Sequence, residues 1–166
     1  MDAKSGVTGA GRKLTLATHF PEINENFYPY KVEGHRHLPE MEQELSRLAG
    51  TQVKVTFVPH LAPLNRGILS TCYASLKRYT EVEKILRIYR DFYKDEPFVE
   101  ILEKGKVPEI SDVATSNRCR IGLAVDERTD RIIVISAIDN LGKGASGQAV
   151  QNMNIMCGFK EDEGLR

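Results

Sequence analysis

The segment 34–40, Gly-His-Arg-His-Leu-Pro-Glu, carries the residue types and the spacing that acid–base chemistry needs. In extended chain, residues two apart point the same way, so His35 and His37 can share a face. Pro39 favours the first turn of a helix, which places His37 just before a helix N-terminus. The positive end of a helix disfavours an imidazolium, so we expect His37 to be neutral and ready to accept a proton.

Two other interpretations of this histidine pair stay open on spacing alone. In the first, His35 and His37 are surface residues that only flank the helix. In the second, they belong to a metal site completed by His19 or His60. The sequence offers no cluster of carboxylates or cysteines that completes a zinc-type ligand set, so no metal is expected.

The segment 57–67, Phe-Val-Pro-His-Leu-Ala-Pro-Leu-Asn-Arg-Gly, presents Arg66 at the entrance to a predicted strand. Its two prolines restrict the backbone on either side of the turn. A firmly held guanidinium suits bidentate binding of a phosphate or a carboxylate. The alternative is an ordinary connecting loop with a solvated arginine.

The segment 142–147, Gly-Lys-Gly-Ala-Ser-Gly, matches the G-x-G-x-x-G pattern of dinucleotide-binding folds. It follows a predicted strand and opens a predicted helix, as that fingerprint requires. The sequence ends at residue 166, so neither a second parallel strand nor an acidic ribose ligand follows the helix. We therefore expect no self-standing dinucleotide site in this segment.

Composition is that of an ordinary soluble domain. The chain has 166 residues, of which 41% are hydrophobic and 28% charged, and this suits one domain with a real core. A formal net charge of zero gives no general attraction to nucleic acid or acidic membranes, and it makes self-association unsurprising. No apolar stretch approaches the roughly 20 residues that span a bilayer, and no apolar run follows Met1 as in a signal peptide.

The three cysteines, Cys72, Cys119 and Cys157, are odd in number and widely spaced. This pattern argues against a disulfide framework or a zinc ribbon, and it favours a reducing, cytoplasmic setting. Each cysteine lies in a predicted strand or on an apolar helix face. All three are therefore expected to be buried structural thiols and not nucleophiles.

Hydrophobic periodicity and turn signals predict helices that alternate with pairs of strands. The predicted helices cover 39–49, a segment from a Thr80–Glu83 capping box to Pro97, and a segment that begins near Ala145. The predicted strands cover 53–59, 68–75, 119–125 and 131–138, and the last two form a hairpin. This order predicts an α+β fold with a mixed, mainly antiparallel sheet and helices packed on one face.

The periodicity also predicts which side chains these helices bury. In the second helix they are Val82, Ile85, Leu86, Tyr89 and Phe92, and in the last helix Ala149, Val150, Met153 and Cys157. Residues 5–12 are expected to form a glycine-punctuated loop, and residues 20–33 to be extended.

Four stretches of the sequence resemble the N-acetyl-gamma-glutamyl-phosphate reductases of arginine biosynthesis, relatives of the semialdehyde dehydrogenases. They are residues 3–12, 34–40, 57–67 and 139–154, and they occur in the family's order. The resemblance implies the fold of the C-terminal domain of glyceraldehyde-3-phosphate and semialdehyde dehydrogenases. It also implies an NADP-dependent enzyme that converts N-acetylglutamyl 5-phosphate to N-acetylglutamate 5-semialdehyde.

The resemblance further implies roles for individual residues. In the family's mechanism a cysteine thiolate attacks the acyl carbon, hydride passes from the nicotinamide, and a histidine handles the proton. His37 is then the first choice for this acid/base, with His35 as the alternative. The candidate substrate-binding residues are Arg66, Arg12, Arg36 and Ser5, and the candidate cofactor-binding residues are Asn140, Gly142, Lys143 and Gly144.

The sequence departs from the family by lacking its N-terminal nucleotide-binding half, including the Ser-Asn-Pro-Gly-Cys nucleophile motif. We therefore expect residues 1–166 to be a single C-terminal domain that is inactive alone. Its expected partners are the acyl phosphate, the nucleotide-binding domain of the same enzyme, which binds most of the NADP, and further copies of itself. Residues 140–158 are expected to form a return helix that packs on that domain. The alternative is a non-catalytic dimerisation or assembly module.

Overall fold

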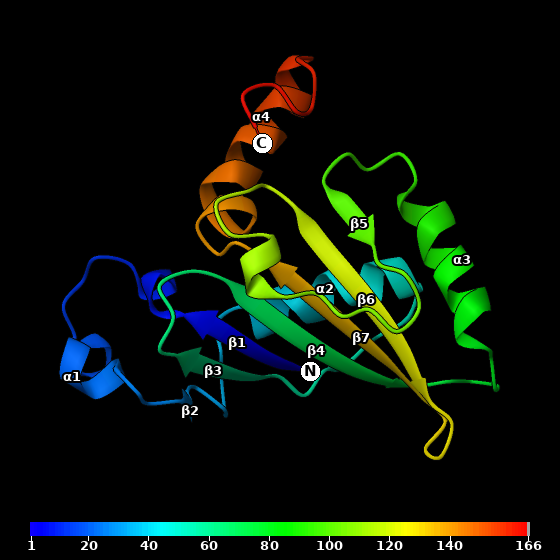
Figure 1. Ribbon diagram of the computed structural model, residues 1–166, viewed down its shortest axis with the longest axis horizontal. Coiled ribbons are helices and arrows are strands. Elements are labelled where there is room, and N and C mark those ends of the chain that lie inside the picture. The colour runs from blue at the N-terminus through cyan, green and yellow to red at the C-terminus, as the bar shows by residue number, and fades with distance from the viewer. Residues whose placement is uncertain (166) are drawn as a thin grey trace.

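The computed structural model describes residues 1–165, which fold around one seven-stranded sheet (Figure 1). The strands are β1 Asp2–Gly6, β2 Tyr28–Pro29, β3 Val58–Ala62, β4 Ile68–Ser75, β5 Val99–Ile101, β6 Cys119–Asp126 and β7 Arg131–Ile138. Their order across the sheet is β2-β3-β1-β4-β7-β6-β5. β1 is parallel to β3 and β5 to β6, whereas the other neighbours are antiparallel. The predicted α+β class with a mixed, mainly antiparallel sheet is confirmed.

The long central strands β4, β7 and β6 are the part of the sheet that the sequence predicts best. β4 and β7 pair along their whole lengths, from Ile68 opposite Ile138 to Ser75 opposite Arg131. The predicted hairpin joins β6 to β7. Its turn is closed by a hydrogen bond from the Arg128 amide to the side chain of Asp126, a local Asx pattern. Runs of β-branched residues between turn formers therefore suffice to define this element.

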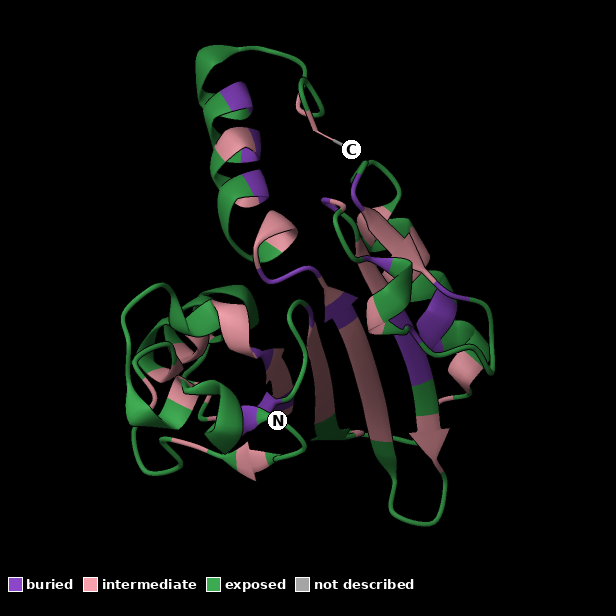
Figure 2. Ribbon diagram, turned by 60° about the vertical axis from the view of Figure 1, so that its left-hand side comes forward, coloured by how far each residue is buried: buried purple, intermediate pink, exposed green. Residues whose placement is uncertain are grey.

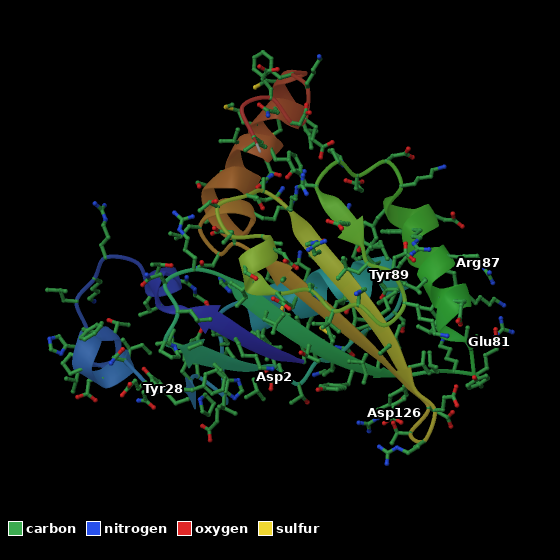
Figure 3. The ribbon with its side chains drawn as sticks, in the orientation of Figure 1. Asp2, Tyr28, Glu81, Arg87, Tyr89 and Asp126 are labelled. Carbon is green, nitrogen blue, oxygen red and sulfur yellow. The ribbon has the colours of Figure 1, made fainter. Side chains whose placement is uncertain are left out.

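Helix α3, Val82–Tyr93, covers one face of the sheet at the β6 side. Its Ile85 and Leu86 are buried against Ile121 and Leu123 of β6, as the periodicity predicts. In Figure 3 the helix presents Tyr89 toward the strands and Arg87 toward solvent. Burial of each such aliphatic side chain stabilises the fold by about 1.5–3 kcal/mol.

Two predicted details of α3 are wrong. The Thr80–Glu83 capping box does not form, because the Thr80 hydroxyl donates to the Arg78 carbonyl and Glu81 occupies the N-cap position. The Glu83 carboxylate instead pairs with Lys104. Phe92 is 69% exposed, since it lies on the side of the helix that is turned away from the sheet.

Helix α2, Leu38–Ala49, begins directly after His37 and ends at Gly50, whose φ of 64° is the left-handed stop that the sequence predicts. In Figure 1 it lies behind the sheet. The strand predicted from Val53 to Pro59 is misplaced, because only its last two residues are in a strand, as the start of β3. The amides of Val53 and Val55 donate to the side chains of Ser46 and Glu42 of α2, so this alternating segment binds a helix and does not pair with a strand.

Helix α4, Gly147–Cys157, follows the π-helical turn η4, Gly142–Ser146, and stands clear of the sheet (Figures 1 and 2). Its predicted inward face is wrong, because Met153 and Cys157 are exposed. Ala149 is also exposed, and Val150 is half-buried. The buried side chains are polar, Gln151 at 5% and Asn154 at 2% exposure. These side chains form hydrogen bonds with the C-terminal turn and with Asn117, in the loop before β6.

The C-terminal turn after α4 is fastened to the helix by these polar side chains. The Asn154 amide group donates to the carbonyls of Glu161 and Glu163 at 3.1 and 2.9 Å. The Gln151 amide group donates to the Glu161 carboxylate at 2.6 Å and accepts from Asn117 at 3.1 Å. Buried polar groups need hydrogen-bond partners, and the side chains of Gln151 and Asn154 have them. The buried face of α4 is therefore polar because it binds the C-terminal turn.

Three short strands and some minor turns were not predicted. β1 lies at the start of the chain and pairs with β3 and β4, and its Ala3 is buried. β2 and β5 are edge strands of two and three residues. The remaining elements are α1 Phe20–Ile23 and the 3₁₀ turns Val7–Ala10, Leu16–Thr18 and Ile110–Asp112. Within residues 1–165, the helices are all too short or too polar to cross a membrane.

Candidate functional site

The two histidines of segment 34–40 lie side by side at the start of α2. Their ring centroids are 5.0 Å apart with planes at 68°. The backbone amide of His37 donates to His35 Nδ1 at 3.3 Å, and the Leu38 amide donates to the His35 carbonyl at 2.9 Å. The shared face predicted from their spacing therefore exists, although it is made by a tight turn and not by extended chain.

The two rings have different surroundings. His35 packs edge-on against Phe57 and Tyr30, with centroid distances of 5.3 and 5.6 Å. Burial lowers the pKa of His35 below its usual value, and the nearby positive groups His37, Lys31 and Arg36 lower it further. A neutral His35 keeps Nδ1 free to accept the His37 amide. His37 is exposed, so its ring is the one that an incoming group can reach.

The segment that carries the histidines also lines an open hollow of about 790 Å³. Its lining residues are Lys31, Val32, Glu33, Gly34, His35, Arg36 and Pro39. Arg36, a predicted substrate-binding residue, is thus beside His35. The lining of the hollow combines the imidazole of His35 with two cationic side chains, Lys31 and Arg36.

A second polar cluster forms where four segments of the chain meet, and its centre is Asp139. This carboxylate, 0% exposed, accepts hydrogen bonds from the amides of Leu141 and Gly142 on one oxygen. The other oxygen accepts from the Thr115 amide at 2.6 Å and from Arg66 Nη1 at 2.9 Å. These donors lower the pKa of Asp139 to about 2, although burial alone would raise it.

Asn140 ties the same cluster to the first turn of the chain. Its carbonyl oxygen accepts from the Gly67 amide at 2.8 Å, and its amide group donates to the Thr8 hydroxyl at 2.9 Å. Ser5, at the end of β1, hydrogen-bonds its neighbouring carbonyl beside Gly9. The structure therefore brings Arg66 and Ser5, two candidate substrate-binding residues, close to Asn140, a candidate cofactor-binding residue.

The predicted glycine-rich segment does not present free amides. The Gly142 amide is bonded to Asp139 Oδ1, and the Gly144 amide is bonded to the Asp139 carbonyl. The Lys143 side chain reaches toward α4, since its Nζ donates to Gln151 at 2.6 Å and lies 5.3 Å from the ring centroid of Phe98. Burial lowers the pKa of this lysine. The amides of Gly142 and Gly144 are therefore both used within the chain.

The histidine pair and Arg66 lie at opposite ends of β3. His35 contacts Phe57, directly before the strand, whereas Arg66 follows its end. The strand between them spans roughly 13 Å. Arg12 belongs to neither group and lies in an exposed loop. A single small substrate can touch both ends only if long side chains or the substrate itself bridge this length.

Other histidines and the cysteines take no part in either cluster. His60 stacks on Phe27 at 5.3 Å, and its Nδ1 is 3.6 Å from Asp2. Within the described 165 residues, no three His, Cys, Asp or Glu side chains gather as metal ligands. Cys72 and Cys119 are half-buried and not fully buried as predicted, and burial raises the pKa of both, which keeps their thiols protonated. Cys157 is exposed, so its predicted burial is wrong.

The roles of Asp139 and Thr115 in the second cluster were not predicted from the sequence. The only local signal was an acidic residue directly after the apolar strand β7. Its partner Arg66 is 73 residues away along the chain, and no periodicity connects the two.

Comparison with known proteins identifies the family. The family model described as "Semialdehyde dehydrogenase, dimerisation domain" matches residues 1–140. The chain belongs to this family. It is 61% identical over 99% of its length to N-acetyl-gamma-glutamyl-phosphate reductase of Pelotomaculum thermopropionicum, and 57% identical over 99% to that of Geobacter metallireducens. It covers 48% of each of these relatives and so spans about half their length.

Solved structures of two aspartate semialdehyde dehydrogenases are similar in fold. Aspartate semialdehyde dehydrogenase II of Vibrio cholerae matches 94% of the chain and 54% of its own, with a TM-score of 0.71 and 16% identity. A probable aspartate-semialdehyde dehydrogenase of Pseudomonas aeruginosa matches 84% and 49%, with a TM-score of 0.62 and 13% identity. At these identities the likeness is one of fold, and it agrees with the predicted domain type.

Proposed function

We propose that this chain is the C-terminal, substrate-side part of an NADP-dependent N-acetyl-gamma-glutamyl-phosphate reductase of arginine biosynthesis. The observation that carries the proposal is the His35–His37 pair at the start of α2, in a chain with 61% identity to one such reductase. The reaction converts the acyl phosphate, NADPH and a proton to the semialdehyde, NADP⁺ and phosphate. Such an enzyme works in the cytoplasm, which the reduced cysteines favour.

His37 is our choice for the acid/base of this reaction. The thiol that attacks the acyl carbon comes from the nucleotide-binding half of the enzyme and must lose a proton. His37 can take that proton because its ring is exposed at the α2 N-terminus. His35 has a different role, since its Nδ1 holds the His37 amide and fixes the turn. His35 is therefore a positioning residue for His37.

Arg66 is our choice for holding an anionic group of the substrate at the other end of β3. Asp139 accepts from Nη1 of Arg66. The Arg66 side chain is 41% exposed, so part of its guanidinium faces outward. Ser5 lies nearby with its hydroxyl bonded to the backbone. Arg12 and Arg36 remain candidates on the exposed surface and at the hollow, respectively.

The cofactor's fit to this chain is limited. NADP supplies the hydride when bound, but Asn140, Gly142, Lys143 and Gly144 all use their polar groups within the chain. They do not form a phosphate cradle, so we assign most of the cofactor's binding to the nucleotide-binding half. In this proposal segment 140–144 lies next to the cofactor, and its hydrogen bonds stabilise the connection between β7 and α4.

Helix α4 is proposed to dock on that nucleotide-binding half. Large apolar residues are exposed on it and just beyond it, namely Met153 at 49%, Ile155 at 57%, Met156 at 85% and Phe159 at 58%. An exposed apolar patch of this kind commonly marks an interface. The C-terminal turn is bonded to Asn154 of α4, whereas these apolar side chains stay exposed.

The test compares this chain with the full-length protein. We expect the full-length protein to oxidise NADPH when given N-acetylglutamyl 5-phosphate, and this chain alone to leave NADPH unchanged. NADPH oxidation by the chain alone would contradict our division of roles. The competing assembly-module function is tested by sedimentation together with turnover: a full-length oligomer without reductase activity would favour it.

A further inference from the structure

The hollow beside His35 gathers positive charge that the chain itself does not neutralise. Lys31 and Arg36 both line it and are exposed. Among residues 1–165, the ion pairs within 4.0 Å include neither of them. The one acidic residue of the lining is Glu33, so the hollow keeps a positive balance. Cations gathered on a concave surface favour an anion there.

The backbone holds Lys31 in place at this hollow. Lys31 has a φ of 47°, in the left-handed region. A residue with a Cβ atom adopts this region only at a cost in conformational energy. Two hydrogen bonds fix the turn: the Tyr30 amide donates to the Pro59 carbonyl at 3.0 Å, and the Gly34 amide to the Lys31 carbonyl at 3.2 Å. The turn between β2 and α2 therefore presents Lys31 and Arg36 at one hollow.

We propose that Lys31 and Arg36 form the subsite for the phosphoryl group of an acyl phosphate, next to His37. The inference rests on the proposed reductase function and adds Lys31, together with the group that these cations bind. The competing cation, Arg66, is partly neutralised by Asp139 and lies beyond the other end of β3. The cations that are free beside the histidines are therefore the ones suited to the leaving group.

This placement accounts for the proton and the charge in the first chemical step. When the thiol sulfur bonds to the acyl carbon, the carbon–oxygen bond to phosphate breaks and phosphate leaves with the electron pair. His37 takes the thiol proton and delivers it to the departing phosphate oxygen. Lys31 and Arg36 stabilise the charge that develops on that group, as fixed cations do in other acyl- and phosphoryl-transfer sites.

The experiment uses the full-length reductase in the reverse direction, where inorganic phosphate is a substrate. Lys31→Gly removes the amine and tolerates the positive φ, whereas Lys31→Arg keeps the charge. We expect Lys31→Gly and Arg36→Met to raise the KM for phosphate about tenfold or more, and to leave the KM for the semialdehyde within about twofold. Lys31→Arg restores most of the phosphate KM. Lys77→Met, an exposed cation after β4, is the matched control.

Equal rises in the KM for phosphate and for the semialdehyde would overturn the inference, as would an unchanged KM for phosphate. A calorimetric titration of the full-length protein with inorganic phosphate alone separates this inference from the proposed activity. Weaker phosphate binding in Lys31→Gly than in the wild type supports the subsite even in a protein without reductase turnover. Equal binding in the two proteins, or no binding in the wild type, overturns it.

Discussion

The ion pair between the buried Asp139 and the partly exposed Arg66 gives the sharpest quantitative prediction for the fold. The folded state lowers the pKa of Asp139 from 3.8 to about 2, and the carboxylate is 0% exposed, so solvent does not screen it. A difference of this size corresponds to about 2 kcal/mol of folding free energy. The stabilisation is present above pH 4, the unfolded value, and is lost as the pH falls through about 2.

Asp139→Asn is the perturbation that tests this reasoning. The amide can still accept from the Leu141 and Gly142 amides, but its NH₂ group then faces the donors of Thr115 and Arg66. Arg66 is 41% exposed and can be rehydrated, which limits the cost. We expect the variant to lose about 3 kcal/mol of unfolding free energy at pH 7.

Urea unfolding followed by circular dichroism, at several pH values from 7 to 2, measures both effects. The difference between wild type and Asp139→Asn should shrink by about 2 kcal/mol from pH 5 to pH 2. Asp95→Asn, at a side chain that is 87% exposed, is the control and should change the unfolding free energy little. A difference that is absent at pH 7, or that does not shrink in acid, would refute the assignment.

Two further variants test other parts of the fold. Gly67→Ala should destabilise the chain by more than about 2 kcal/mol in urea unfolding, because Gly67 has a φ of 110° and an added Cβ would lie 2.2 Å from Ile110 Cγ2. Gly50→Ala, at a φ of 64° with open space around it, is the milder comparison, and equal losses would contradict the steric argument. Asn154→Ala removes two hydrogen bonds to the C-terminal turn, so amide hydrogen exchange should quicken over residues 159–165. Unchanged exchange there, with Asn152→Ala as the surface control, would show that the clasp does not hold the turn.

The sequence predicts those elements of the fold that depend on local patterns. β4, β6, β7 and α2 follow from runs and caps that lie within the elements themselves. The segment 53–57 alternates like a strand, but side chains of α2 bind its amides, and alternation contains no information about that competition. The short strand β1 depends on partners more than 50 residues away, so its local pattern was too weak to identify it.

In the candidate site, too, the local contacts were predicted from the sequence and the long-range contacts were not. The sequence predicts that His35 and His37 share a face, and the structure confirms that they are neighbours, although a tight turn and not extended chain brings them together. The pairing of Arg66 with Asp139 crosses 73 residues and depends on the completed sheet. The prediction of an apolar buried face on α4 was wrong because this helix packs on backbone carbonyls. Asn154 binds two of these carbonyls, so the buried position is polar.

The proposed acid/base role of His37 is tested most directly by the turnover of the full-length reductase with His37→Asn. His37 is exposed and asparagine suits a helix N-cap, so we expect the fold to be retained. The account predicts a fall in kcat on the order of 100-fold or more, with little change for the control His19→Asn. An unchanged kcat in His37→Asn would contradict the account.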